Sequence, residues 1–401
     1  MVRAALRREW TRLPPLYWAL WLGTLVNKAG GFVIPFLALY VGDTLGLGEE
    51  RAGLVMAAYG AGGIVAALVG GALADGIGRR ATMLVSLGLG AIATLALGFA
   101  RELGALALAS FAVGALAEMY RPAVNAMVVD IVPAADRPLA YGRLYWAVNL
   151  GFAIAPPLAG LALRANVLLL FVVDAVTMLA FAAVTLRFPD TRPKRDPAKR
   201  TARDTGWARL LRDRIFLAVV ALAGMVAFVM WQNGTALPLD MARKGIAPTT
   251  YGLLMSVNGI LIVVLQPMLT PQLGRFRRTM VLALATLVFG AGFGLYGVAR
   301  TPAAYVGAIA IWTVAEIALL PTTSAVVADL APDDMRGRYQ GAHSMAWGVA
   351  STLAPWLGGR MLAQRGGAAL WMGCFTLMVG AAAAHLSLGP AREKRERATR
   401  D

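Results

Sequence analysis

Long apolar stretches separated by short polar segments make up most of the chain. Residues 81–100, for example, are 20 residues without a charge, about the length of a helix that crosses a bilayer. The apolar residues run continuously instead of alternating, which favours helices over the strands of a membrane barrel. We therefore predict an all-α membrane protein with twelve transmembrane helices. The predicted spans are residues 15–42, 51–74, 81–100, 104–132, 140–163, 166–188, 215–238, 250–273, 279–299, 302–330, 338–360 and 366–388.

The composition agrees with this pattern. Of the 401 residues, 58% are hydrophobic and 15% are charged, whereas soluble domains carry about 25% charged residues. The first apolar stretch is too long for a removable signal peptide and lacks a small-residue cleavage site. The single cysteine, Cys374, falls in the last predicted span and can form no internal disulfide.

The basic residues gather on one side of the predicted membrane. The formal net charge of +16 would by itself suggest a nucleic-acid partner. With the N-terminus inside, however, 28 of the 38 Lys and Arg residues fall in inner segments and 8 in outer loops. The positive-inside rule then predicts a multi-pass protein of the inner (cytoplasmic) membrane with both termini in the cytoplasm. The lipid bilayer, and not nucleic acid, is the expected partner.

The two halves of the chain repeat each other. A shift of 199 residues aligns them without a gap over about forty positions, with these matched pairs: Pro122 and Pro321, Asp130 and Asp329, Pro133 and Pro332, Arg137 and Arg336, Gly142 and Gly341, Pro156 and Pro355, Gly160 and Gly359. This parallel repeat predicts two pseudo-symmetric six-helix bundles, residues 1–188 and 215–401. The basic segment 189–214 is the expected cytoplasmic linker. Its residues Trp207, Leu210 and Leu211 predict a short interfacial helix, the alternative being a solvated linker.

Residues 71–80 form a compact motif between spans 2 and 3. They read Gly-Ala-Leu-Ala-Asp-Gly-Ile-Gly-Arg-Arg. Gly71 is expected to let helices approach closely, and Gly76 and Gly78 to permit a tight reversal. Asp75 is expected to accept hydrogen bonds from the free N–H groups at a helix start.

This motif resembles the cytoplasmic loop signature of the major facilitator superfamily. The resemblance implies two six-helix bundles that rock about a central substrate site, and a latch between them in the outward-facing state. Residues 273–278 of the second half lack a carboxylate, so only the first latch is expected to be intact. A turn that merely sets topology is the alternative. The residues assigned to the latch are Gly71, Asp75, Gly78, Arg79, Arg80 and Asp130.

A second motif lies in spans 5 and 11. Residues 155–160 read Ala-Pro-Pro-Leu-Ala-Gly and residues 354–359 read Ala-Pro-Trp-Leu-Gly-Gly. Both resemble the Gly-Pro-x-x-Gly-Gly signature of drug/proton antiporters, with alanine in place of some glycines. Residues 125–130 and 145–150 also resemble the twelve-span multidrug antiporters. Proline kinks a helix, so the expected hinges are Pro122, Pro156, Gly160, Pro321, Pro355 and Gly359.

Charged residues at the centres of three spans are the main functional candidates. Lys28, Glu118 and Glu316 fall at the midpoints of spans 1, 4 and 10, where burying a charge costs at least about 2.5–3.5 kcal/mol. Arg121 lies three residues after Glu118 on the same helix face and is expected to keep it ionised. A purely structural ion pair is the alternative. Pro122 removes the hydrogen bond to the Glu118 carbonyl and predicts a kink there.

Glu316 differs from Glu118, because no cation lies within one helical turn of it. Burial without a paired charge suits a carboxyl group that binds and releases a proton. We therefore predict Glu316 as the principal proton carrier or cation-binding carboxylate, with Glu118 and Arg121 also in proton coupling. A salt bridge between Glu316 and Lys28 is the alternative. Asp174, in span 6, is expected to make a structural hydrogen bond.

Aromatic and amide side chains on these spans could shape a substrate pocket. Together with a carboxylate they suit a lipophilic cation. The predicted pocket residues are Asn27, Lys28, Tyr120, Tyr145, Trp146, Asn149, Trp231, Gln232, Asn233, Asn258, Trp312 and Trp347. The two histidines, His343 and His385, are too far apart in sequence to suggest a metal site and are expected to pack at span ends.

These observations predict a secondary transporter that exports small lipophilic or cationic molecules by proton antiport. A facilitator or symporter of a polar or anionic metabolite, bound by Lys28 and Arg121, is the alternative, and a non-transporting receptor is a third. No phosphate-binding loop with Lys-Ser/Thr, no Gly-x-Ser-x-Gly motif and no His/Cys cluster is present, so we expect neither an enzyme nor a cofactor. The expected partners are the substrate, protons and lipid, with the protein a monomer.

Overall fold

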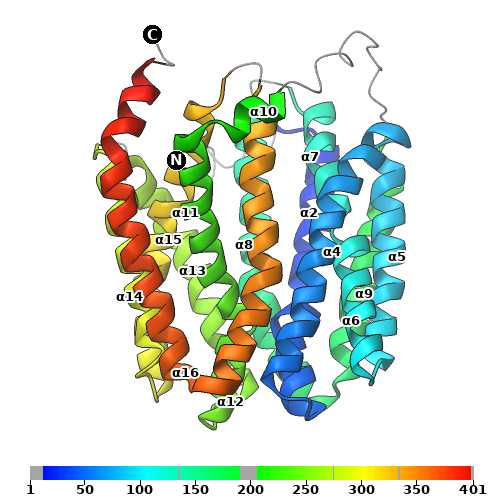
Figure 1. Cartoon of the computed structure of the whole chain (residues 1–401). Helices are drawn as coiled ribbons and strands as arrows, with labels where there is room; N and C mark the ends of the chain where they lie inside the picture. The colour runs from blue at the N-terminus through cyan, green and yellow to red at the C-terminus, as the bar shows by residue number, and fades with distance from the viewer. Residues whose placement is uncertain (1–11, 134–135, 190–205, 274, 333–334, 399–401) are drawn as a thin grey trace, which may run out of the picture.

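The fold is known from a computed structural model that describes residues 12–133, 136–189, 206–273, 275–332 and 335–398. Within these residues every regular element is helical (Figure 1). The first half contains α2 (Pro15–Ala29), α3 (Val33–Leu39), the π-helix η1 (Tyr40–Thr44), α4 (Glu49–Gly76), α5 (Arg79–Phe99), α6 (Leu103–Ala117), α7 (Tyr120–Ile131), α8 (Arg137–Ala165) and α9 (Leu168–Thr185). The second half contains α11 (Arg214–Trp231), the 3₁₀ helix η4 (Gln232–Gly234), α12 (Ala236–Arg243), α13 (Pro248–Leu273), α14 (Arg278–Leu295), α15 (Pro302–Leu330) and α16 (Arg336–Ala398).

The twelve predicted spans all correspond to helical segments. By length and composition, 11 helices of the described chain could cross a membrane. The last of them, Arg338–Arg395, is interrupted at Gly366, where φ is 77°, and therefore holds the two final spans. The predicted span 302–330 coincides with α15. The predicted span 215–238 ends earlier, because α11 stops at Trp231.

Three predicted spans are interrupted, spans 1 and 4 near their centres and span 7 near its end. Span 1 breaks between α2 and α3, span 7 breaks at η4, and span 4 breaks between Ala117 and Tyr120. The break in span 4 confirms the predicted kink: Pro122 has no N–H to donate to Glu118 O, which instead accepts from Arg121 N at 3.2 Å. Pro321 behaves differently, because it lies inside the continuous α15.

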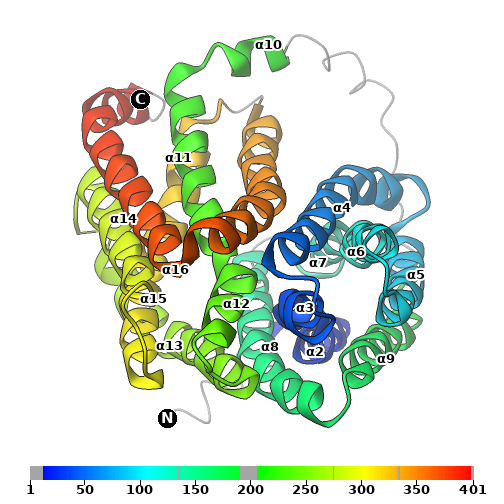
Figure 2. The same cartoon turned by 60° about the horizontal axis from the view of Figure 1, so that its bottom comes forward.

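The two halves lie side by side as separate bundles (Figure 2). We call the end that carries α10 (Gly206–Leu211) the α10 end, and the opposite end the α12 end. Residues 190–205 of the predicted linker lie outside the described residues. The helix predicted beyond them is present as α10, with Leu210 buried and Leu211 exposed.

Close helix crossings join the halves toward the α12 end. A Cβ atom placed on Gly53 of α4 would lie 2.3 Å from Pro355 O of α16, and one placed on Gly252 of α13 would lie 2.3 Å from Pro156 O of α8. Gly53 and Gly252 are 199 residues apart, as are Pro156 and Pro355. The two crossings are therefore copies of one another, and the repeat extends to α4 and α13.

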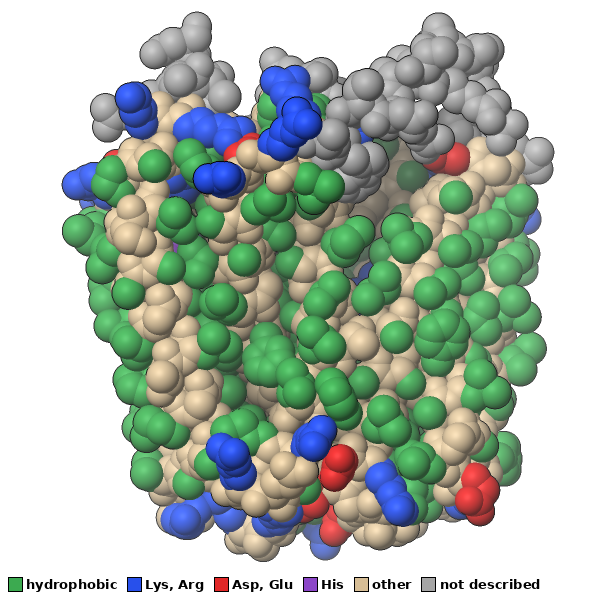
Figure 3. All heavy atoms as spheres, viewed as in Figure 1, with side chains coloured by type: hydrophobic (Ala, Val, Ile, Leu, Met, Phe, Trp, Pro, Cys, Tyr) green, Lys and Arg blue, Asp and Glu red, His purple; other side chains and the backbone are tan. Residues whose placement is uncertain are grey.

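Two further glycines lie at the same crossings, and an ion pair also joins the halves at one of them. A Cβ on Gly359 would lie 2.4 Å from Glu49 O, and one on Gly160 would lie 2.9 Å from Thr249 Cα. Glu49 also pairs with Arg243 of the other half. The halves are thus closed at the α12 end, whereas the space-filling view shows a hollow between them toward the α10 end (Figure 3).

We predict that Gly53→Ala and Gly252→Ala each destabilise the protein. The added methyl group overlaps a carbonyl oxygen that belongs to the other half, and such overpacking costs about 1–3 kcal/mol. Apparent melting temperature in detergent measures the effect. Gly71→Ala is the matched control, since a Cβ there meets nothing within 4 Å. A control that loses as much stability as the two crossing variants would contradict the packing account.

Candidate functional site

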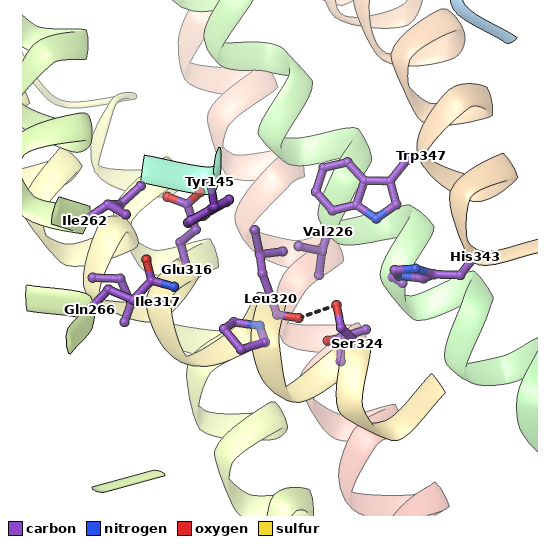
Figure 4. Close-up of a pocket in the computed structure, with 13 residues that line it drawn as sticks. Tyr145, Val226, Ile262, Gln266, Glu316, Ile317, Leu320, Ser324, His343 and Trp347 are labelled. Carbon is purple, nitrogen blue, oxygen red and sulfur yellow. Dashed lines mark hydrogen bonds between the residues drawn. The ribbon is translucent and has the colours of Figure 1, made fainter. Parts of the chain in front are cut away.

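A cavity of about 370 Å³ lies where the halves face each other. Only Tyr145 of its lining comes from the first half, on α8; the remainder comes from α11, α13, α15 and α16 (Figure 4). The lining residues are Tyr145, Ala223, Val226, Ile262, Gln266, Glu316, Ile317, Leu320, Pro321, Thr323, Ser324, His343 and Trp347. A mostly apolar space with one carboxylate and a few polar groups is typical of a small-molecule site.

Glu316 is the only acidic residue of this lining, and it is 8% exposed. Its Oε2 accepts a hydrogen bond of 2.9 Å from Asn258 Nδ2 on α13. The same amide nitrogen donates to Thr313 Oγ1 at 3.0 Å. Within the described part of the chain no Lys or Arg pairs with Glu316, and Lys28 lies against Glu118 instead. The alternative of a Lys28–Glu316 salt bridge is therefore wrong for this conformation.

A second cluster of charges occupies the break in span 4. Glu118 follows the end of α6 and pairs with Arg121 at the start of α7. Lys28 Nζ of α2 lies 3.9 Å from Glu118 Oε1, and Tyr59 Oη of α4 donates to the same oxygen at 2.9 Å. Four helical segments thus converge on one carboxylate, which has two cationic neighbours.

Of the predicted pocket residues of the first half, only Tyr145 lines the cavity, and the others make contacts outside its lining. Tyr120 accepts a hydrogen bond of 3.1 Å from Asn27 Nδ2, and its ring centroid is 5.7 Å from Lys28 Nζ. Asn149 donates to Tyr145 O at 2.9 Å. Trp146 lies under Arg143, whose guanidinium carbon is 5.3 Å from the ring.

Several predicted pocket residues of the second half do not line the cavity. Trp312 is 2% exposed and donates to Tyr296 Oη at 2.7 Å within an aromatic cluster. Gln232 is fully buried and donates to Ala354 O at 3.0 Å. Asn233 accepts a hydrogen bond from Tyr251, and Trp231 packs against the apolar core. Tyr145 and Trp347 do line the cavity. Asn258 does not line it but donates a hydrogen bond to Glu316, which does.

Two titratable residues outside these groups can also be placed. Asp174 is 4% exposed and accepts from Val33 N at 3.2 Å, which confirms the expected structural hydrogen bond and fixes the start of α3. His343, expected to be a packing residue, lines the cavity one turn before Trp347 on α16. His385 is buried.

The structure corrects three expectations for the loop motif. Gly71 makes no close approach, and the tight contact falls on Gly70, whose Cβ would lie 2.8 Å from Met119 O. Asp75 does not cap a helix start, because it lies in the last turn of α4 with its side chain 71% exposed. The reversal needs Gly78, with φ 99°, but not Gly76, which has no positive φ.

The predicted ion pairs of the motif are present within the first half. Arg79 Nε lies 3.2 Å from Asp130 Oδ2, and Arg79 Nη1 lies 3.6 Å from Asp75 Oδ1. Arg79 Nη1 also donates to Ala74 O at 3.1 Å. Arg80 follows as the second residue of α5. The group ties α4, α5 and α7 together, and its role as a latch between the halves stays a prediction.

An ion pair that matches Arg79–Asp130 is also present in the second half, and the expectation that only the first latch is intact stays a prediction. Arg278 Nη1 lies 2.6 Å from Asp329 Oδ2, and these residues are 199 positions after Arg79 and Asp130. The carboxylate comes from the end of α15 and not from the loop, which is why the loop sequence alone did not reveal it. Glu393, near the end of α16, adds an ion pair of 3.0 Å to Arg277.

Sequence reasoning missed Tyr59 and Gln266. Tyr59 is the one aromatic residue of the predicted span 51–74, and that isolation was the available signal. Gln266 lies about two turns beyond Asn258 on α13 and lines the cavity. An amide inside an otherwise apolar span was its signal.

We predict that Gly78→Ala destabilises the protein by about 1–3 kcal/mol, since φ 99° and ψ 159° form a conformation that only glycine adopts readily. Gly76→Ala, two residues away and with nothing within 4 Å of its Cβ, is the matched control. Apparent melting temperatures of the two variants test this. Equal losses would contradict the assignment of the reversal to Gly78.

Comparison with known proteins agrees with this architecture. The sequence profile described as "Major Facilitator Superfamily" matches residues 20–239 and 220–401. The chain is 25% identical to the uncharacterized MFS-type transporter YqjV of Bacillus subtilis (strain 168), over 88% of this chain and 87% of that protein. It is 26% identical to a Na(+), Li(+), K(+)/H(+) antiporter of Planococcus maritimus, over 82% of this chain and 85% of that protein. It is 29% identical to the quinolone resistance protein NorA of Staphylococcus aureus (strain Mu50 / ATCC 700699), over 32% of this chain and 33% of that protein. Among solved structures, the nucleoside transporter NupG superposes with a TM-score of 0.79 at 16% identity, covering 93% of this chain and 99% of that chain.

Proposed function

The chain belongs to the major facilitator superfamily, and from this premise we propose that it is a proton antiporter that exports small lipophilic cations. A protein of this family with twelve apolar helices is a multi-pass membrane transporter. The proposal concerns its cargo, its energy source and its direction. It rests mainly on one observation, the position of Glu316.

Glu316 offers a carboxylate to the cavity without a fixed counter-ion. Its hydrogen-bond partner is the neutral amide of Asn258, and the cavity wall around it is mostly apolar, with a few neutral polar residues such as Gln266 and Ser324. A proton or an organic cation can each neutralise this carboxylate, but both cannot do so together. Competition for one carboxylate makes release of the proton a condition for binding the cargo, which is the coupling that an antiporter needs.

The closed α12 end supports alternating access. The paired crossings at Gly53 and Gly252 hold the halves together at that end, while the hollow lies toward the α10 end. Because the predicted inner segments hold 28 of the 38 basic residues and include α10, we assign the α10 end to the cytoplasm. The conformation is then inward-facing, and it loads cargo from the inside.

A monovalent-cation antiporter is a second candidate. The relative from Planococcus maritimus carries that name and aligns over most of both chains. Near Glu316, Thr313 supplies one further oxygen atom, Oγ1, while Asn258 turns its amide nitrogen toward both residues. Oxygen ligands suit hard cations. The apolar wall of the cavity favours an organic cargo over this alternative.

We predict that Glu316→Gln reduces proton-driven efflux of the cationic dye ethidium to the level of vesicles that lack the protein, because the amide can carry neither the proton nor the charge. Inverted vesicles with an imposed pH gradient measure this. Glu50→Gln is the matched control, as Glu50 is exposed in the first turn of α4. Normal efflux by the Glu316 variant, at equal amounts in the membrane, would rule out the mechanism.

We also predict that added ethidium, but not added NaCl or KCl, releases protons from acid-loaded vesicles. An internal pH-sensitive dye reports the release. Proton release on addition of either salt would favour the monovalent-cation candidate. A protonophore should abolish ethidium accumulation, and accumulation that persists in its presence would count against proton coupling.

A further inference from the structure

The charged cluster of the first half lies outside the cavity lining, but the repeat relates its helix face to the face of α15 that lines the cavity. Glu118, Arg121 and Asn125 lie 199 residues before Ile317, Leu320 and Ser324, and these three residues of α15 all line the cavity. The repeat relates α7 to the corresponding part of α15, so the face of α7 that carries Arg121 points toward the axis between the halves.

A chain of contacts supports this placement. Asn125 lies one turn after Arg121, and its carbonyl accepts a hydrogen bond of 3.0 Å from Tyr141 Oη on α8. Tyr145 lies one turn after Tyr141 and lines the cavity opposite Glu316. The exposed faces of α7 and α8 therefore form one continuous wall that ends at the cavity.

Arg121 has the most exposed side chain among the three charged residues of its cluster, Lys28, Glu118 and Arg121. Its side chain is 53% exposed, whereas those of Lys28 and Glu118 are 13% and 17% exposed. Arg121 lies near the middle of its span, so this exposure requires an open space beside it. In the cluster, Lys28 and Arg121 pair with the carboxylate of Glu118, and the buried carboxyl group of Asp174 also interacts with Lys28. The first half thus presents the half-open guanidinium of Arg121, and the second half presents a carboxylate without a cationic partner.

We infer that the central site takes zwitterionic molecules, with an acidic group of the cargo at Arg121 and a protonated amine at Glu316. This deepens the proposed function and rests on it for the direction of transport. A guanidinium with half its surface open can donate two parallel hydrogen bonds to a carboxylate. A cargo with only a positive charge can pair with Glu316 but offers no acceptor to Arg121.

Three probes on one scaffold test the inference: a piperazinyl quinolone carboxylic acid, its ethyl ester and its N-acetyl derivative. At neutral pH these are a zwitterion, a cation and an anion of similar shape. Equilibrium dialysis with the purified protein measures their affinities without any gradient. The wild type should bind the acid about tenfold more tightly than either derivative, since a hydrogen bond to a charged group contributes about 1.5–3 kcal/mol.

Three variants test which residue binds which end of the probe. Arg121→Gln should bring the affinity ratio of acid to ester close to one, while Arg121→Lys, which keeps the charge but loses the paired donors, should retain only part of the preference. Glu316→Gln should remove the preference of acid over N-acetyl derivative. Size-exclusion profiles and melting temperatures confirm folding.

Three results would overturn the inference: ester and acid binding equally to the wild type, Arg121→Gln weakening all three probes by the same factor, or no binding of any probe. Because affinities are measured without a gradient, a failure of proton coupling in vesicles leaves these ratios unaffected. The two proposals can therefore fail separately.

Discussion

Placing a charged side chain in the apolar interior of a membrane costs free energy, and this structure depends on how that cost is offset. Glu118 meets that cost with Arg121, Lys28 and the Tyr59 hydroxyl, whereas Glu316 has a neutral amide from Asn258. A charge without partners would favour its neutral form or an enclosed polar space. The two halves provide such a space because they touch closely at one end and part toward the other. The site is therefore a consequence of how the halves meet.

The close contact between the halves depends on small residues at equivalent positions of the repeat. Gly53 and Gly252 bring backbone against the carbonyls of Pro355 and Pro156, and the repeat makes these two crossings equivalent. Pro156 and Pro355 looked like hinges in the sequence. In the structure they are contact points between the bundles, which suits a pivot about which both halves can rock.

Much of the fold could be predicted because its signals are local. Apolar length predicts the spans, Pro122 predicts the break at Glu118, and the absence of a nearby cation singles out Glu316. The rest depends on which face of each helix turns inward, which the nearly uniform apolar composition of these spans does not reveal. Gly70 and not Gly71 makes the close contact for this reason, and Trp312 belongs to an aromatic core instead of the pocket.

The central claim is that protonation of Glu316 decides which way the halves open. Pulsed electron–electron distance measurements test it most directly, with spin labels at Gly142 and Gly341, repeat mates near the α10 end with open space around both, in a chain whose one native cysteine is replaced by alanine. The account predicts that the distance distribution shifts between acidic and alkaline pH in the otherwise wild-type protein, and that Glu316→Gln shows one pH-independent distribution. An equal pH response in both proteins would contradict it.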